Sequence, residues 1–110
     1  MGKFRMSLTI LRILALMYAE LDTHHYGLEL GRAAALSNGA LYPALDRLER
    51  AGFLTSALED IDEKAEGRRK RRYYRLTASG IRFAEEELRA APGLPVRAGV
   101  QLFTFWRRLA

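Results

Sequence analysis

The 110-residue chain has no cysteine, only three prolines and no apolar run long enough to cross a bilayer. The lack of cysteine excludes disulfides and cysteine-based metal sites, and it suits a reducing cytoplasm. The apolar stretch from Met6 to Met17 carries Arg12, is too short for a membrane span and lacks a small-residue cleavage pattern. We therefore expect a cytoplasmic protein with no membrane partner.

The sequence also lacks the residue arrangements of an enzyme. Its serines, histidines and carboxylates show no nucleophile arrangement, and there is no glycine-rich phosphate loop. His24 and His25 are neighbours in a predicted turn, with no third or fourth metal ligand in view. We expect no enzymatic activity, no metal and no cofactor.

Positive charge is concentrated in one short segment, Arg68 to Arg75. This segment holds six of the eighteen basic residues, so the rest of the chain has twelve basic and thirteen acidic residues. A local positive field attracts polyanions, because each neutralised phosphate releases condensed counterions. Alternation of arginine and tyrosine fits a half-buried strand. We predict a basic strand that binds nucleic acid; the alternative is a solvated hairpin with no partner.

Apolar residues make up 49% of the chain, and their spacing predicts one domain rich in helices with one β-hairpin. Helices are expected over residues 8–21, 26–35, 38–51 and 78–91, with a further apolar helix over 96–110 after a break at 92–95. A period of two predicts strands over 53–59 and 71–76. Leu54 and Leu58 share one face of the first strand, whereas alternation alone leaves open which of Tyr73 and Tyr74 points inward.

Local signals define the ends of these elements. Ser7, Ser37 and Thr77 are good helix N-caps, and Gly52 is a typical helix stop. Residues 22–25 and 60–67 are predicted to be turns.

Three residues inside the predicted helices have structural consequences. Gly27 and Gly31 predict the close approach of another backbone to the second helix. Pro43 predicts an irregular or tight first turn in the third helix.

Three short helices followed by a hairpin is the order of a winged helix-turn-helix. The predicted fold class is therefore mainly α with a small β-hairpin (α+β), ending in C-terminal dimerisation helices. Residues 1–80 would form the DNA-binding domain and residues 81–110 a helical dimerisation segment. The third helix would offer its first residues to base edges in the major groove, while the basic hairpin reaches the adjacent backbone or minor groove.

Three sequence blocks resemble the PadR family of bacterial transcriptional regulators: Tyr26 to Leu30, Leu36 to Glu49, and Arg72 to Thr77 with Gly80. The resemblance covers about residues 8–80. It implies a homodimeric repressor on a palindromic operator, with C-terminal helices at the dimer interface and often a small-molecule inducer. It also implies DNA contacts in the third helix and in the wing.

Topology, charge and this resemblance together predict a sequence-specific regulator that binds double-stranded DNA. The predicted DNA-binding residues are Ser37, Asn38, Gly39, Tyr42, Arg47, Gly67, Arg68, Arg69, Lys70, Arg71, Arg72 and Tyr74. Two alternatives remain: a winged-helix module whose tail and wing bind a protein partner, and a non-specific nucleic-acid binder.

The last fifteen residues are apolar on more than one side, which predicts a surface that pairs with a second copy of the chain. The candidates for this dimer contact, or for a small aromatic effector, are Leu102, Phe103, Phe105, Trp106 and Leu109. Packing is the preferred account, since aromatic residues at helical spacing usually belong to a core.

Overall fold

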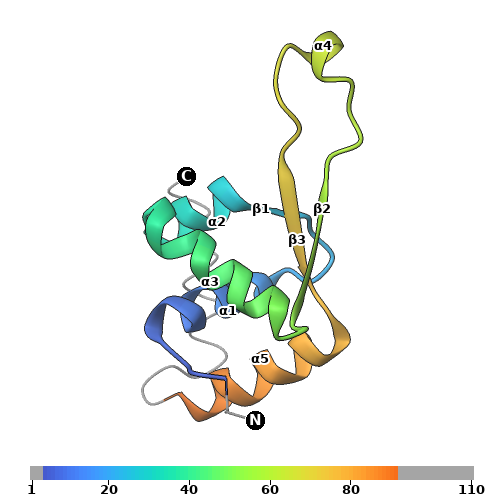
Figure 1. Ribbon diagram of the computed structural model, residues 1–110. Helices are drawn as coiled ribbons and strands as arrows, with labels where there is room; N and C mark the ends of the chain where they lie inside the picture. The colour runs from blue at the N-terminus through green and yellow to red at the C-terminus, as the bar shows by residue number, and fades with distance from the viewer. Residues whose placement is uncertain (1–3, 92–110) are drawn as a thin grey trace.

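The computed structural model describes residues 4–91, which form five helices and three strands (Figure 1). In chain order these are α1 (Leu8–Ala19), β1 (His25–Tyr26), α2 (Gly27–Ala34), α3 (Asn38–Arg50), β2 (Leu54–Leu58), α4 (Glu63–Glu66), β3 (Arg72–Leu76) and α5 (Ala78–Ala90). Within this part of the chain, no helix combines the length and the apolar character needed to cross a membrane.

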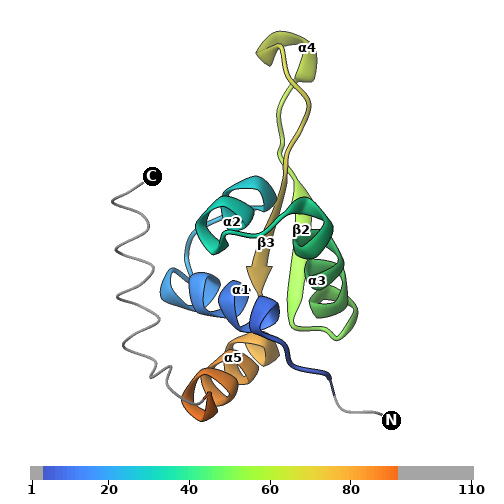
Figure 2. The same cartoon turned by 90° about the vertical axis from the view of Figure 1, so that its left-hand side faces the viewer.

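The hairpin of β2 and β3 projects from the helices, with α4 at its tip (Figures 1 and 2). Helices α1 and α5 pack together at the opposite side of the molecule. In both views α3 begins at the end that faces the direction in which the hairpin projects. The first turn of α3 and the hairpin are therefore presented on the same side.

The predicted helix caps are confirmed. The hydroxyls of Ser7, Ser37 and Thr77 each accept a hydrogen bond from the amide three residues later, at 3.2, 3.2 and 3.0 Å. Helix α3 runs through Pro43 without a break, and its first turn is tight, because the Ala40 amide donates to the Ser37 carbonyl at 3.1 Å. Each cap satisfies an amide that the helix itself leaves without a partner.

The end of α3 is fixed by a glycine turn. Gly52 has φ +84°, and the Phe53 amide donates to the Leu48 carbonyl at 3.0 Å while that of Gly52 donates to Glu49 at 3.0 Å. This pair of bonds is the Schellman arrangement, which favours glycine at the left-handed position. The predicted stop at Gly52 is confirmed, and it sets where β2 begins.

One hydrophobic core joins the helices to the base of the hairpin. The buried apolar side chains are Ile10, Ile13, Leu14, Leu16, Met17, Leu30, Ala34, Leu41, Ala44, Leu45, Leu48, Leu54, Tyr74, Ala84 and Leu88. Ala84 and Leu88 of α5 belong to this core, so the domain boundary expected at residue 80 falls inside a helix that packs against the rest of the described fold.

A third strand was missed by the sequence analysis, which assigned residues 22–25 to a turn. His25 and Tyr26 form β1 and pair antiparallel with Tyr74 and Tyr73 of β3, so the sheet order is β1-β3-β2. His25 is buried, its Nε2 donates to the Glu20 carbonyl at 2.7 Å, and burial lowers its pKa. A buried neutral imidazole with a backbone partner is a structural residue. No cluster of metal-binding side chains occurs in the described part of the chain.

The hairpin differs from the prediction in two places. Leu58, expected on the buried face with Leu54, is 50% exposed, because the hairpin has left the helices by that point. Residues 60–67, predicted to be a turn, contain the helical turn α4, which Asp62 caps by accepting hydrogen bonds from the amides of Lys64 and Ala65 at 3.0 and 3.3 Å. The predicted helix over 96–110 and its candidates Leu102 to Leu109 lie outside the described residues.

Candidate nucleic-acid interface

The first turn of α3 is exposed at Ser37, Asn38 and Gly39. Ser37 directs its hydroxyl to the Ala40 amide, so its side chain is used by the helix cap. Asn38 has no such role, and its amide group can both donate to and accept from a base edge. The arrangement therefore offers a short polar patch at the start of a helix, where base readout in this fold occurs.

Tyr42 lies one turn further along α3 and packs over α2. A Cβ added at Gly27 would lie 3.0 Å from both Cε1 and the hydroxyl oxygen of the Tyr42 ring, which is 40% exposed. At Gly31 an added Cβ would lie 3.1 Å from Cδ2 of Leu41. An added Cβ at Gly31 would also lie 3.4 Å from the Leu36 carbonyl oxygen. The two glycines thus allow α3 to pack closely against α2, mainly through the side chains of Leu41 and Tyr42.

Arg47, predicted to contact DNA, is engaged with the N-terminal segment of its own chain. Its guanidinium donates to the Arg5 carbonyl at 2.7 Å and lies 4.8 Å from the centre of the Phe4 ring. Phe4 in turn packs edge-on against Phe53 and Phe83. Arg47 thus connects the start of the chain to α3, and contact of its guanidinium with DNA would require it to leave these partners.

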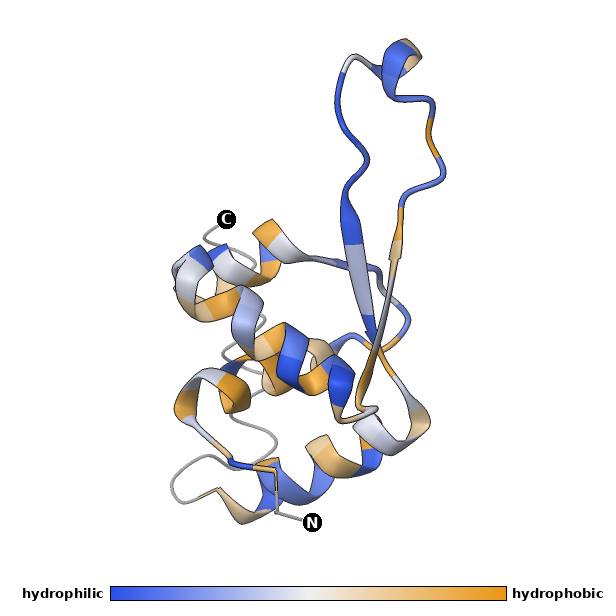
Figure 3. Cartoon of the chain, in the orientation of Figure 1, coloured by the Kyte–Doolittle hydropathy of each residue, from blue (hydrophilic) through white to orange (hydrophobic). Residues whose placement is uncertain are grey.

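The positive charge lies on the arm of the hairpin that leads into β3, residues 68–72, which we call the basic arm. In Figure 3 this arm is strongly hydrophilic along its length. Arg69, Lys70 and Arg71 are exposed, and their charged groups make no hydrogen bond or ion pair with any residue of 4–91. Three unpaired cations on one projecting arm match the spaced negative charges of a duplex backbone.

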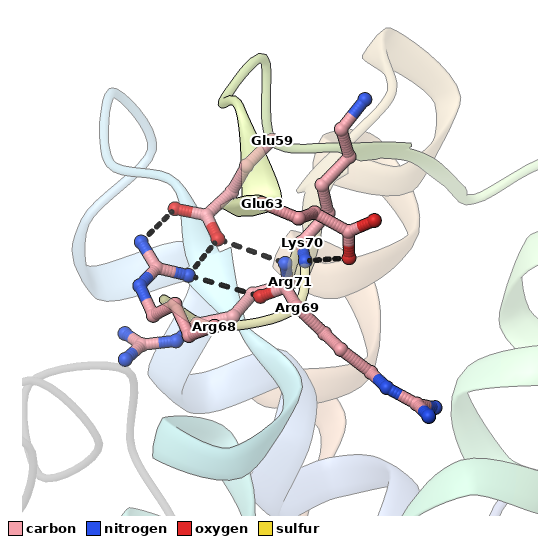
Figure 4. Close-up of polar contacts among 6 residues, drawn as sticks. All are labelled: Glu59, Glu63, Arg68, Arg69, Lys70 and Arg71. Atoms are coloured by element: carbon pink, nitrogen blue, oxygen red, sulfur yellow. Dashed lines mark hydrogen bonds and ion pairs between the residues drawn. The ribbon is translucent and has the colours of Figure 1, made fainter. Parts of the chain in front are cut away.

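Arg68 is not one of these available cations. Its guanidinium donates to both carboxylate oxygens of Glu59, at 2.7 and 3.1 Å, and to the Arg69 carbonyl at 3.2 Å (Figure 4). The hydrogen bond from Arg68 is the main cause that lowers the pKa of Glu59 to about 2. The ion pair is bidentate, and its hydrogen bonds are charge-assisted, which makes them stronger than hydrogen bonds between neutral groups. The Arg68 guanidinium is therefore bound within the wing, unlike the charged groups of Arg69, Lys70 and Arg71.

Arg72 is held at the junction of the wing and α3. Its Nη1 donates to the Ser56 hydroxyl at 3.1 Å, and that hydroxyl donates to the Glu49 carboxylate at 2.6 Å. The three residues come from β3, β2 and α3, so one polar chain connects both strands of the wing to the helix. These two hydrogen bonds link the base of the wing to α3.

Two further residues predicted to bind DNA, Gly67 and Tyr74, have roles in the fold itself. The Tyr74 ring is 6% exposed and belongs to the core, and burial is the first cause that raises its pKa. It therefore cannot reach DNA, which corrects its assignment. Gly67 has φ +68° and ends α4, so it shapes the tip of the wing through its backbone.

The residues that sequence reasoning missed are acids and a hydroxyl: Glu49, Ser56, Glu59 and Glu63. The sequence did contain a signal for part of this set. An acidic run, residues 59–66, directly precedes the basic run in the loop of a predicted hairpin. Opposite charges facing each other across a hairpin predict cross-strand ion pairs.

Several solved structures have a similar fold. The chain resembles MepR, in a mutant form from a multidrug resistant S. aureus clinical isolate, with TM-score 0.65 and 16% identity over 97% of this chain and 82% of MepR. It resembles smu.1704 from Streptococcus mutans, with TM-score 0.56 and 28% identity over 70% and 73% of the two chains. A PadR family transcription regulator from Clostridium difficile gives TM-score 0.55 and 25% identity over 88% and 92%.

The family assignment comes from a match between residues 13–86 and the transcriptional regulator PadR-like family. The chain matches no curated protein. The matched residues include α2, α3 and the whole wing, the elements that form the site described above. The chain therefore belongs to the PadR-like family of transcriptional regulators and is a winged-helix, DNA-binding regulator, not an enzyme.

Proposed function

We propose that the protein is a homodimeric repressor that binds a palindromic operator in the cytoplasm. The observation that carries the proposal is the joint presentation of the α3 start and the basic arm of the wing, connected through Glu49, Ser56 and Arg72. Helix α3 would lie in the major groove, with Asn38 at base edges and Ser37, Gly39 and Tyr42 beside it. Arg69, Lys70 and Arg71 would contact phosphates.

Base readout by α3 is tested by Asn38→Ala. We expect the variant to lose about 1–3 kcal/mol of discrimination between operator and random duplex, because one specific base contact is removed. The operator would be sought as an inverted repeat in the DNA upstream of the coding region. Affinity for both duplexes is measured by fluorescence anisotropy at fixed salt.

The control for Asn38→Ala is Glu86→Ala, which removes an exposed side chain from α5, away from the wing. Glu86→Ala should leave the discrimination unchanged. An equal loss of affinity on both duplexes in Asn38→Ala would mean that Asn38 only contacts the backbone.

Dimerisation through the C-terminal residues is supported by their apolar sequence and by the family. The helices and strands of residues 4–91 share one buried core, so we expect truncation after Ala91 to leave a folded protein. We expect light scattering to show a monomer, with weaker binding to a full palindrome because the two half-sites are no longer linked. A dimer that survives truncation would place the interface on α1, where Leu8 is 56% exposed.

An effector is a further part of the proposal, supported only by the resemblance and by the aromatic side chains of Phe103, Phe105 and Trp106. A small flat aromatic molecule is the chemical class that such side chains bind. Release of operator DNA on addition of such a compound would be the expected response of an inducible repressor.

A further inference from the structure

The outer part of the wing, residues 59–71, has little support from the sheet or the core. Pairing of β2 with β3 ends at Leu58 and Arg72. Next to that pair, the Glu59 amide donates to the Arg71 carbonyl at 2.9 Å. No side chain of this segment is buried. A loop with so few buried contacts samples many conformations unless side chains restrain it.

Two carboxylates supply that restraint (Figure 4). Glu59 accepts from the Arg68 guanidinium through both oxygens, and its Oε1 also accepts from the Arg71 amide at 2.8 Å. Glu63 Oε2 accepts from the Lys70 amide at 2.9 Å. The acidic arm therefore holds the backbone of the basic arm at two successive residues.

These contacts leave the charges of the basic arm available. Lys70 and Arg71 are held through their main-chain amides, and no carboxylate within residues 4–91 pairs with their side-chain charges. In Figure 4 the cationic ends of Arg69, Lys70 and Arg71 point away from both glutamates. Glu59 and Glu63 thus hold the basic arm in place, and of its cations only Arg68 has its charged group paired with one of these carboxylates.

We propose that Glu59 is a positioning residue for DNA binding, because its carboxylate holds the loop in the shape that presents Arg69, Lys70 and Arg71 to the phosphates. The inference rests on the proposed function in one respect, namely that the wing contacts DNA. It goes beyond that function by assigning a positive role in DNA binding to an acidic side chain.

Charge and shape predict opposite effects of removing this carboxylate. Glu59→Gln would raise the net charge of the wing by one and release Arg68, so a purely electrostatic account expects tighter binding to DNA. In the positioning account, the loop of the Glu59→Gln variant is less ordered in the free protein and must become ordered when it binds DNA. That loss of conformational freedom weakens the complex. The Glu59 carboxylate accepts two hydrogen bonds from the Arg68 guanidinium and one from the Arg71 amide, so its removal weakens three restraints on the loop at once, and we expect this loss of shape to outweigh the gain of one positive charge.

The experiment measures binding of the full chain to a random-sequence duplex of about 30 base pairs over a range of salt concentrations. Phosphate contacts do not depend on sequence, so the operator is not needed. We expect Glu59→Gln to bind about tenfold more weakly, with an unchanged slope of log K against log[salt], because ordering is lost while the phosphate contacts remain. The melting temperature should stay near that of the parent protein, since the segment is outside the core.

The matched control is Asp60→Asn, which removes an adjacent exposed carboxylate with no hydrogen bond in the described chain. It should bind as tightly as the parent protein or more tightly. Glu59→Gln binding as tightly as Asp60→Asn would overturn the positioning role.

A double variant, Arg69→Ala with Arg71→Ala, separates this inference from the proposed function. Weaker binding in the double variant, with no loss in Glu59→Gln, overturns the inference alone. An unchanged affinity and salt slope in the double variant removes the wing from the DNA interface, and both proposals then fail together.

Discussion

Replacing Arg69 and Arg71 together by alanine is expected to weaken binding to every duplex by about sixtyfold at 0.1 M salt. Each phosphate contact contributes about 0.9 to the slope of log K against log[salt], so two lost contacts lower the slope by about 1.8. The structure selects these two arginines because Arg68 is paired with Glu59 and Arg72 is held by Ser56. Titrations of a fluorescent duplex at four salt concentrations give both the affinity and the slope.

The control is a second double variant, Arg82→Ala with Arg89→Ala, which removes the same charge from exposed positions on α5. This helix lies on the opposite side of the molecule from the wing (Figures 1 and 2). The control should change the affinity only slightly, because its charges lie on a helix away from the wing and salt screens exposed charges at a distance. Equal losses in the two variants would mean that net charge, and not contact by the wing, governs binding.

The helices and their ends could be predicted from the sequence because each signal is local. The spacing of Leu41, Leu45 and Leu48 places one face of α3 in the core, and Ser37 and Gly52 mark its two ends. These features depend on residues within one or two turns of each other, where propensity and periodicity are informative. The order of elements then indicated the winged helix.

The two-residue strand β1 could not be predicted, because its identity comes from a partner nearly fifty residues away. His25 and Tyr26 form a strand only because Tyr73 and Tyr74 lie beside them. Two residues are too few to show a period of two. The place of His25 in the sheet was therefore missed.

Residue type alone does not show which charged groups of the predicted DNA-binding set already have partners within the protein. Arg47 and Arg68 have the same chemistry as Arg69 but are used by the protein itself. Alternation did not settle which tyrosine is buried. Both Tyr73 and Tyr74 pair with β1 and β2, and it is Tyr74 that packs into the core. Only the three-dimensional contacts separate these roles.

Gly80→Ala is expected to destabilise the protein by about 3 kcal/mol, although alanine is the better helix former. A Cβ at this position would lie 1.9 Å from the Phe53 carbonyl oxygen and 2.9 Å from its carbonyl carbon. Both obstacles are backbone atoms of the turn between α3 and β2, and they cannot rotate away as a flexible side chain would.

That turn is also tied to α5 by hydrogen bonds. The Thr77 amide donates to the Phe53 carbonyl at 3.0 Å, and the hydroxyls of Thr77 and Ser79 donate to the Gly52 carbonyl at 2.7 and 3.1 Å. Moving α5 outward to accept a methyl group would stretch these bonds and withdraw Leu88 from the core. The melting temperature should fall by about 15 °C, measured by circular dichroism.

Gly39→Ala is the matched control, because Gly39 also lies in the first turn of a helix. The nearest heavy atom to a Cβ at Gly39 is the Ser37 hydroxyl oxygen at 3.9 Å, an ordinary contact. This variant should gain up to about 1 kcal/mol from helix propensity. If Gly80→Ala melted at or above the temperature of Gly39→Ala, α5 could not be packed against the turn as closely as the structure shows. The glycine at position 80 would then have to be explained by something other than its contact with the Phe53 backbone at the base of the wing.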